Sequence, residues 1–202
     1  MKTEYITDRL ILRILTPRAL REVLEFQIRN QELFERYEPA RPANFYTLTY
    51  QKALLKCEYD LALKLSSVRF YVFRREAPYT IIGTVCMHDI SRTAHSCCEL
   101  GYKFDSAWHR QGFAKEALAE TIRIAFFELR LHRVFARVVP DNLPSIRLLQ
   151  SLDFMQEGTE YASIQIQGKW TDHLRFALIC PSILPEETFS CYSSMKRYQH
   201  PN

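Results

Sequence analysis

The chain has 202 residues, of which 47% are hydrophobic and 25% are charged. This length and this balance are typical of one globular domain and exclude a chain that is disordered as a whole. The net charge is only +4, and the Lys and Arg residues are dispersed, which disfavours a nucleic-acid partner. No stretch is apolar enough to cross a bilayer, and the start MKTEYITDRLILR carries charges where a secretory signal needs an apolar run. We therefore expect a cytoplasmic protein without a membrane partner.

The six cysteines show neither a CxxC pair nor the spacing of a zinc site. We therefore expect no metal, and free thiols in a reducing compartment. Cysteines of this kind usually serve as small core residues, although a nucleophilic cysteine stays open. They stand at positions 57, 86, 97, 98, 180 and 191.

The first half of the chain predicts a strand, two helices and three further strands. Alternating apolar residues over 9–15 indicate the first strand. Thr16 then caps a helix that has Pro17 in its first turn. A proline-containing loop over 38–46 precedes a second helix at about 49–65. Three strand-like runs follow, and the turn residues between them predict an antiparallel meander. These runs cover residues 69–74, 81–90 and 97–104.

The second half predicts a strand–helix–strand crossover that is followed by a hairpin. An amphipathic helix runs from about 114 to 131, and the apolar run 133–139 has the pattern of a central strand covered on both faces. A short helix over 145–152 and an alternating hairpin over 158–179 complete the pattern. Residues 181–202 lack clear periodicity and predict a loose C-terminal tail. The order of elements indicates an α+β (mixed α/β) domain over 1–180, built on one sheet.

Residues 108–117, which read WHRQGFAKEA, join a strand to the long helix and can form an anion site. Such a junction exposes unpaired backbone N–H groups and the positive end of the helix dipole, which together bind phosphate. Gly112 lets the backbone approach an anion closely, and Arg110 and Lys115 can add charge at the rim. The alternative is a plain turn before a helix.

The segment RQGFAKEAL resembles the acyl-CoA-binding signature of the GNAT superfamily, which reads Gln/Arg-x-x-Gly-x-Gly/Ala. His109 stands at its first position, where the family usually has Gln or Arg, Gly112 at the fourth and Ala114 at the sixth. Other segments resemble, in the same order, the branch that contains the ribosomal-protein alanine N-acetyltransferases. They are TDRLILR, IIGTVCMHDI, ELGYKFD, HRVFARVVPDNLPSIRLLQSLDF and GKWTDH, and the resemblance covers about residues 3–180.

The resemblance implies a GNAT domain, with a mostly antiparallel twisted sheet that contains a splayed strand pair and is flanked by helices. It implies acetyl-CoA as the donor, with its pyrophosphate on the backbone of 111–115 and its pantetheine arm along 99–103. The thioester is expected in the gap between that strand and 133–139. The expected cofactor-binding residues are Leu100, Gly101, Tyr102, His109, Arg110, Gln111, Gly112, Phe113, Ala114, Lys115, Asn142 and Ser145.

The expected catalytic residues are Glu99 and Ser145. A carboxylate near the thioester can take the proton of the attacking amine, directly or through water, and Glu99 is the leading candidate. A solvated strand carboxylate is the alternative, and His88 is a second candidate base. Ser145 matches a family serine that can protonate the leaving thiolate, or it is a routine residue of a helix start. Asn142 matches a family asparagine that bonds the pantetheine, but it also suits a helix cap.

We therefore expect an N-acetyltransferase that moves an acetyl group to an amine by direct attack, assisted by a carboxylate base. A protein or peptide N-terminal α-amine is the first hypothesis for the acceptor. The alternatives are a small amine, such as a polyamine, an amino acid or an aminoglycoside, and a non-catalytic acyl-CoA sensor. The acceptor is expected beside residues 32–46 and 161–173, where Glu35, Glu38 and Asp172 can attract a cation. Both a monomer and a homodimer remain open.

Overall fold

The computed structural model describes residues 1–180, and the tail predicted from residue 181 lies outside them. The strands are β1 (Glu4–Ile6), β2 (Leu10–Arg13), β3 (Val68–Arg74), β4 (Ala77–Ser91), β5 (Cys97–Phe104), β6 (Arg133–Val138), β7 (Met155–Ile166) and β8 (Lys169–Ile179). The helices are α1 (Leu20–Arg29), α2 (Gln31–Glu35), α3 (Leu48–Leu63), α4 (Phe113–Arg123) and α5 (Leu143–Ser151). Three short turns complete the order: η1 (Pro17–Ala19), η2 (Ser106–Trp108) and the π-helical η3 (Ile124–Glu128).

All strands belong to one eight-stranded sheet in the order β1-β2-β3-β4-β5-β6-β8-β7. Neighbouring strands are antiparallel except β5 and β6, which are parallel. The pairing of β5 with β6 covers only Cys97↔Arg133 to Glu99↔Phe135, whereas β5 continues to Phe104 and β6 to Val138. The sheet therefore opens beyond Glu99. This confirms the predicted α+β domain with a splayed strand pair.

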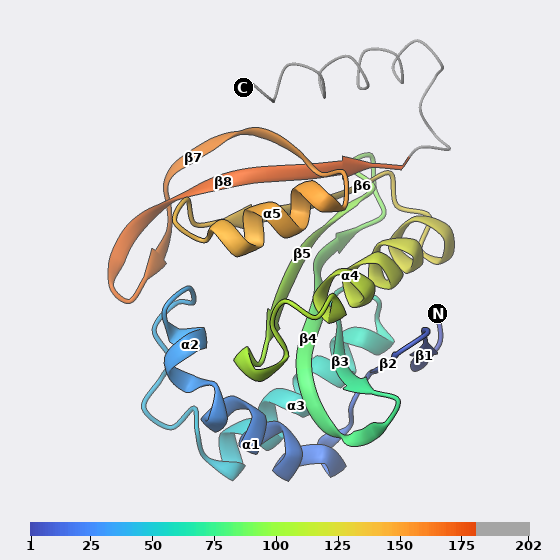
Figure 1. The fold of residues 1–202 in the computed structure, drawn as a ribbon, viewed down its shortest axis with the longest axis vertical. Helices are drawn as coiled ribbons and strands as arrows, with labels where there is room; N and C mark the ends of the chain where they lie inside the picture. Colours follow the sequence, from blue (N-terminus) through green and yellow to red (C-terminus); the bar gives the residue numbers. More distant parts are fainter. Residues whose placement is uncertain (181–202) are drawn as a thin grey trace.

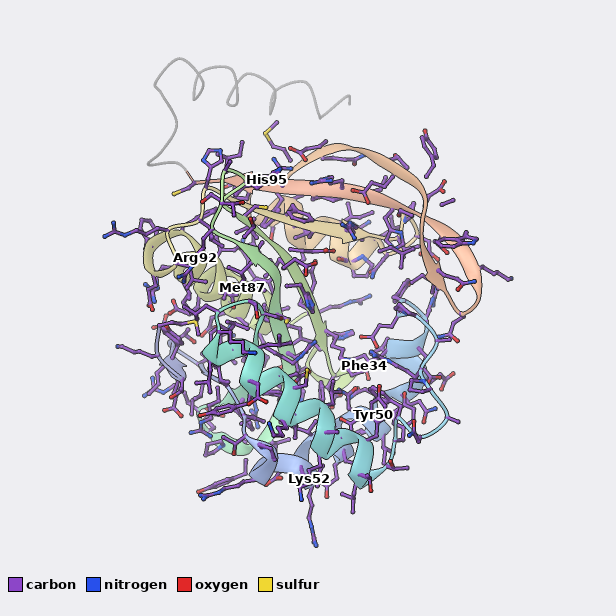
Figure 2. The ribbon with its side chains drawn as sticks, turned by 180° about the vertical axis from the view of Figure 1, so that it is seen from behind. Phe34, Tyr50, Lys52, Met87, Arg92 and His95 are labelled. Carbon is purple, nitrogen blue, oxygen red and sulfur yellow. The ribbon has the colours of Figure 1, made fainter. Side chains whose placement is uncertain are left out.

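Helices pack on both faces of the sheet (Figure 1). Ala117 and Leu118 of α4 and Leu149 of α5 join the larger core on one face. On the other face, α1 and α3 pack a smaller core against β3 and β4, which includes Phe26, Leu55 and Tyr71 among its members. Seen from behind, α3 crosses the half of the sheet that holds β3 and β4 (Figure 2). The half that holds β6, β8 and β7 carries ion-paired side chains instead, which are Arg133, Arg137, Glu157, Glu160 and Arg175.

Several predicted boundaries differ from the structure. The predicted helix over 114–131 ends as regular α-helix at Arg123 and continues as the π-helical turn η3, because the N–H of Leu129 bonds the carbonyl of Ile124. The turn expected at 77–78 is part of β4, since Ala77 already pairs with Arg74. Two elements of the structure, β1 and α2, were not predicted. Both are short, and β1 buries only one side chain, so neither gives a periodic pattern.

Candidate active site at the opened sheet

The junction between β5 and α4 presents a helix N-terminus to solvent. Gly112 is the residue before the helix and has φ 81° and ψ −3°, a left-handed conformation that favours glycine. The first backbone hydrogen bond of the helix runs from Glu116 N to Gly112 O at 3.1 Å. The N–H groups of Phe113, Ala114 and Lys115 therefore precede the hydrogen-bond ladder of α4 and lie at its positive end. This arrangement can bind a phosphate group.

Side-chain hydrogen bonds stabilise the loop that leads into this junction, and most of them are made with the loop's own backbone. Asp105 accepts a hydrogen bond from Ala107 N at 3.0 Å and another from Arg29 Nε at 2.7 Å. A ring nitrogen of His109 lies 2.9 Å from the carbonyl oxygen of Phe104. The Gln111 side chain donates to Ala107 O at 3.1 Å. The side chains of His109 and Gln111 thus stabilise the loop conformation. The groups that remain available to an anion are the backbone N–H groups at the start of α4.

Sequence reasoning missed the contacts by which the β1–β2 turn supports the junction. Glu116 accepts hydrogen bonds from Thr7 Oγ1 at 2.6 Å, from Arg9 N at 2.9 Å and from Arg9 Nε at 2.7 Å. Arg9 also donates through Nη1 to Gln111 O at 3.0 Å. Burial raises the pKa of the Glu116 carboxyl, but the hydrogen bonds from Thr7 and Arg9 outweigh it and hold this pKa below its usual value. An acidic residue in the first turn of a helix was the available signal.

The other predicted cofactor-binding residues divide between core and surface. The side chains of Leu100 and Phe113 are buried in the larger core, where Trp108 also packs, so only their backbone can face a ligand. Arg110 and Lys115 are exposed at the junction.

Glu99 lies at the last rung before β5 and β6 separate. It pairs with His88 of β4 on one side and with Phe135 of β6 on the other. Its side chain is 19% exposed and lies 3.6 Å from Arg137 Nη1. Burial is the largest effect on this carboxyl and raises its pKa, and Arg137 opposes this rise only in part. A carboxylate with a raised pKa beside an opening in the sheet is suited to accept a proton.

His88 faces the same side of the sheet as Glu99, because the two residues are directly opposite each other. Its Nδ1 lies 3.5 Å from Cys86 Sγ. Burial and the charge of Arg69 lower the pKa of His88, so the ring is neutral near pH 7. Its Nε2 would lie 3.0 Å from a Cβ added at Gly101, so the glycine leaves room for this ring. His88 therefore packs against the backbone of β5 as a half-buried hydrogen-bonded histidine.

Tyr102 and Ser145 meet on the opposite face of β5, because alternate residues of a strand point to opposite sides. The hydroxyl of Tyr102 lies 2.7 Å from Ser145 Oγ. Burial raises the pKa of this phenol, so it stays protonated. Asn142 Oδ1 accepts a hydrogen bond from Ser145 N at 3.3 Å, which shows Asn142 as the cap of α5. Asp153, at the end of that helix, adopts the left-handed conformation with φ 66°.

The tip of the β7–β8 hairpin reaches the end of α2 (Figure 1). Gln167 donates through Nε2 to Glu35 O at 2.9 Å and to Glu38 O at 3.2 Å. Close by, Glu38 forms ion pairs with Arg41 and with Lys103 of β5, whose Nζ lies 2.9 Å away. The two segments in which the sequence analysis expected the acceptor are therefore in contact with each other.

The carboxylates expected to attract a cationic acceptor each have a partner within the chain. Glu38 is paired with Lys103 and Arg41. Glu35 accepts from the hydroxyl of Tyr46 at 2.8 Å, and Asp172 accepts from Ala162 N at 2.8 Å. The Lys103 ammonium lies 4.5 Å from the centre of the Phe34 ring, and Figure 2 shows Phe34 beside the end of β5. Burial lowers the pKa of Lys103 to about 8, although Glu38 opposes this shift.

Residues 1–180 contain neither a candidate metal site nor a candidate membrane-spanning helix. No three His, Cys, Asp or Glu side chains of this region are grouped so that they could hold a metal ion. None of its helices is long and apolar enough to span a membrane.

Comparison with known proteins places the chain in a family. The family described as "Acetyltransferase (GNAT) domain" matches residues 9–155. The probable N-acetyltransferase YjcK of Bacillus subtilis is 32% identical over 160 residues, which cover 79% of this chain and 88% of YjcK. The [Ribosomal protein uS5]-alanine N-acetyltransferase of Escherichia coli is 28% identical over 184 residues, which cover 91% of this chain and 94% of the relative.

Solved structures show the same fold. The ribosomal-protein-S5-alanine acetyltransferase of Vibrio fischeri superposes with a TM-score of 0.84 at 26% identity, covering 91% of this chain and all of the other. Mycobacterium smegmatis RimJ, solved with CoA-disulfide, gives a TM-score of 0.80 at 22% identity, covering 87% of this chain and 84% of the other. The family match spans most of the chain, and it contains both the junction and the opened strand pair. The chain belongs to the GNAT family of acetyltransferases and is an acyltransferase, with acetyl-CoA as the donor of that family.

Proposed function

We propose that this protein acetylates the α-amine of a protein or peptide N-terminus and uses Glu99 as the base. Two relatives that share most of its length carry names that describe acetylation of an alanine of a ribosomal protein. The observation that carries the proposal is the position of Glu99, which is partly buried, has a raised pKa and lies where the sheet opens.

The junction before α4 fits the diphosphate of acetyl-CoA. The N–H groups of Phe113, Ala114 and Lys115 precede the helical ladder, and Gly112 carries no side chain above them. A Cβ added at Gly112 would meet the Arg9 guanidinium at 3.2 Å and would sit on a left-handed backbone. In the proposed complex, the backbone of 111–115 holds the diphosphate, and Arg110 and Lys115 add positive charge at the rim.

The opened strand pair fits the pantetheine arm. Beyond Glu99 the inner side of β5 has no partner in β6 among the described residues, so its backbone is free to bond an extended chain. When bound, acetyl-CoA supplies a thioester whose acetyl carbon forms a bond to the amine nitrogen while its bond to sulfur breaks. Leu100 stays in the core and keeps the strand in place.

The two proton transfers are assigned to opposite faces of β5. Glu99 receives a proton from the acceptor amine on the face that carries Arg137 and His88. On the other face, Ser145 donates a proton to the departing sulfur and is replenished by the Tyr102 hydroxyl, 2.7 Å away. The raised pKa of Tyr102 keeps its hydroxyl protonated, so the hydroxyl holds a proton that can pass to Ser145.

The acceptor is placed at the contact between α2 and the β7–β8 hairpin. Gln167 joins these segments, and Lys103 and Glu38 line them as an ion pair. Because Glu38 is already neutralised, we expect the acceptor to be held mainly by backbone and apolar contacts around its N-terminal residue.

Acetyl-CoA binding and thiol release test this function. Calorimetry on the full chain should show binding of acetyl-CoA, and thiol release should follow with peptides that begin with Ala or Ser. Glu99→Gln should lower kcat by about 100-fold or more and leave the Kd for acetyl-CoA unchanged, as loss of a general base does. Glu25→Gln, an exposed glutamate of α1, serves as the matched control and should keep full activity.

Each other outcome has a defined meaning. Binding without turnover on any amine would contradict the proposal and favour an acyl-CoA sensor. Turnover on polyamines, amino acids or aminoglycosides but not on peptides would replace the acceptor class. An unchanged rate in Glu99→Gln would remove Glu99 from the reaction.

A further inference from the structure

A row of alternating charges crosses the half of the α3-bearing sheet face that no described helix covers, and it ends at Glu99. We call this row the charge ladder, and its members are Arg133, Glu157, Arg175, Glu160, Arg137 and Glu99. Each neighbour in the row is within ion-pair distance of the next. The ladder thus connects β6, β8 and β7 to the candidate base on β5.

The two inner arginines of the ladder share one carboxylate, that of Glu160. Arg137 of β6 and Arg175 of β8 are directly opposite each other, so both point to the same face, where like charges repel. Glu160 of β7 relieves this repulsion, with one oxygen 3.1 Å from Arg137 Nε and the other 3.0 Å from Arg175 Nη1. Both guanidinium groups lie over the ring of Phe135, 5.8 Å and 4.6 Å from its centre.

Arg137 therefore stands between two carboxylates. Its Nε is 3.1 Å from Glu160, and its Nη1 is 3.6 Å from Glu99. The contact with Glu160 is the shorter one. The negative charge of Glu160 therefore offsets part of the stabilisation that Arg137 gives to the Glu99 carboxylate. We propose that Arg137 is a positioning residue that divides its charge between Glu160 and Glu99, and that this division sets the pH range in which Glu99 accepts the proton of the acceptor amine. The inference rests on the proposed function of Glu99.

Groups from every neighbouring strand face Glu99. Asp89 and His88 come from β4, Arg137 from β6, and Glu160 and Arg175 from β7 and β8. Burial raises the pKa of Glu99, the two arginines lower it, and Asp89 and Glu160 raise it. Within the ladder, Arg137 opposes the effect of burial on the Glu99 pKa, and Glu160 weakens the effect of Arg137.

The division predicts shifts of opposite sign in two variants of the full chain. Arg137→Gln removes the nearest positive charge, so the Glu99 carboxyl should titrate at higher pH. Glu160→Gln removes a negative charge and frees Arg137, so Glu99 should titrate at lower pH. Arg137→Lys keeps the charge and should restore much of the wild-type behaviour. Arg133→Gln serves as the matched control. It removes the same charge from the same strand, but Arg133 pairs with Glu157 and not with Glu99, so the shift should be much smaller.

The carboxyl carbon resonance of Glu99, assigned by comparison with Glu99→Gln, reports this titration as pH is varied. The acid limb of kcat/KM for a peptide acceptor should move in the same directions as the resonance. Far-ultraviolet circular dichroism and thermal unfolding check that each variant is folded, which we expect because the Arg137 side chain is 31% exposed.

The two readouts separate the ladder from the proposed function. Equal shifts in Arg137→Gln and Arg133→Gln, or shifts of the same sign in Arg137→Gln and Glu160→Gln, would overturn the inference. Opposite shifts of the resonance with an unmoved rate profile would confirm that Arg137 is shared, but would contradict the role of Glu99 as base. If no tested amine is acetylated, the resonance still decides the inference about Arg137.

Discussion

At the scale of single residues, backbone conformation matters as much as side-chain chemistry. Gly112 contributes no functional group, yet its φ of 81° turns the chain into α4 and leaves the helix N-terminus uncovered. Asn142, in the loop between β6 and α5, is the reverse case: its side chain is already used by the local backbone, because it caps α5. The cap uses the Asn142 side-chain oxygen and not the side-chain nitrogen. A contact between Asn142 and the cofactor remains a prediction.

Gly112→Val should weaken binding of acetyl-CoA more than it weakens the fold. A β-branched side chain on a left-handed backbone costs about 1–2 kcal/mol, and here its Cβ would also meet the Arg9 guanidinium at 3.2 Å, beside the N-terminus of α4. We expect the Kd for acetyl-CoA, measured by calorimetry, to rise by about tenfold or more. Gly168→Val is the matched control, because Gly168 has a similar φ of 80° but lies at the hairpin tip. Equal affinity in the two variants would count against the diphosphate at this junction.

The residues of the candidate site were predictable to different degrees. The glycine and small residues of 110–118 form a contiguous pattern, so the sequence pointed to the junction directly. For Glu99 the sequence left both faces of the strand open, and only the register with His88 and Phe135 shows which one it takes. Arg137 and Glu160 could not be assigned, because each becomes a neighbour of Glu99 only through strand pairing between segments far apart in the chain.

At the scale of elements, the periodic segments were predictable and the short ones were not. The main strands and the helices α1, α3 and α5 follow from apolar spacing, which reports packing on one face. The π-helical turn η3 contains Phe127, which is 63% exposed, within an otherwise apolar run. Spacing alone cannot show where an i→i+4 pattern widens to i→i+5.

Gln167→Ala should change acceptor binding without changing donor binding. The Gln167 amide joins the hairpin to α2 by two hydrogen bonds, and their loss should raise KM for a peptide acceptor about fivefold, which corresponds to ~1 kcal/mol. Steady-state kinetics measures this change, with the Kd for acetyl-CoA as the unchanged reference. Gln165→Ala removes an amide that bonds Gly168 within the same hairpin, so it should leave KM nearly as it is. If both variants behave alike, the contact between hairpin and α2 has no part in acceptor binding.

At the scale of the whole molecule, the two halves of the same sheet face are stabilised differently. Where α3 covers the sheet, a largely buried polar cluster joins helix to strand: Glu58 accepts from Arg69 Nε at 2.7 Å and from the hydroxyl of the buried Tyr71 at 2.8 Å. Where no described helix covers it, the charge ladder is partly exposed to water. The deeper burial of the first cluster makes it more sensitive to the loss of one partner, and water screens the second more strongly.

Glu58→Ala should therefore destabilise the protein strongly. It leaves the charge of the partly buried Arg69 and the hydroxyl of Tyr71 without their carboxylate, which costs about 1–3 kcal/mol. For a chain of this size, thermal unfolding should show a fall in Tm of roughly 2–4 °C for each kcal/mol. Glu76→Ala breaks the exposed ion pair with Arg74 and should change the free energy of unfolding by about 0.5 kcal/mol or less. Similar Tm values for the two variants would contradict this division of the molecule.

The short pairing of β5 with β6 also has a consequence for how this sheet meets other polypeptides. Unpaired strand edges normally lie at the outer margin of a sheet, where they invite aggregation with other chains. Here β1 and β7 form that margin. The unpaired parts of β5 and β6 are two further edges, and they lie in the middle of the sheet order. A ligand that fills this interior gap binds the native state alone, so it should raise the free energy of unfolding by about 2.7 kcal/mol at one hundred times its Kd.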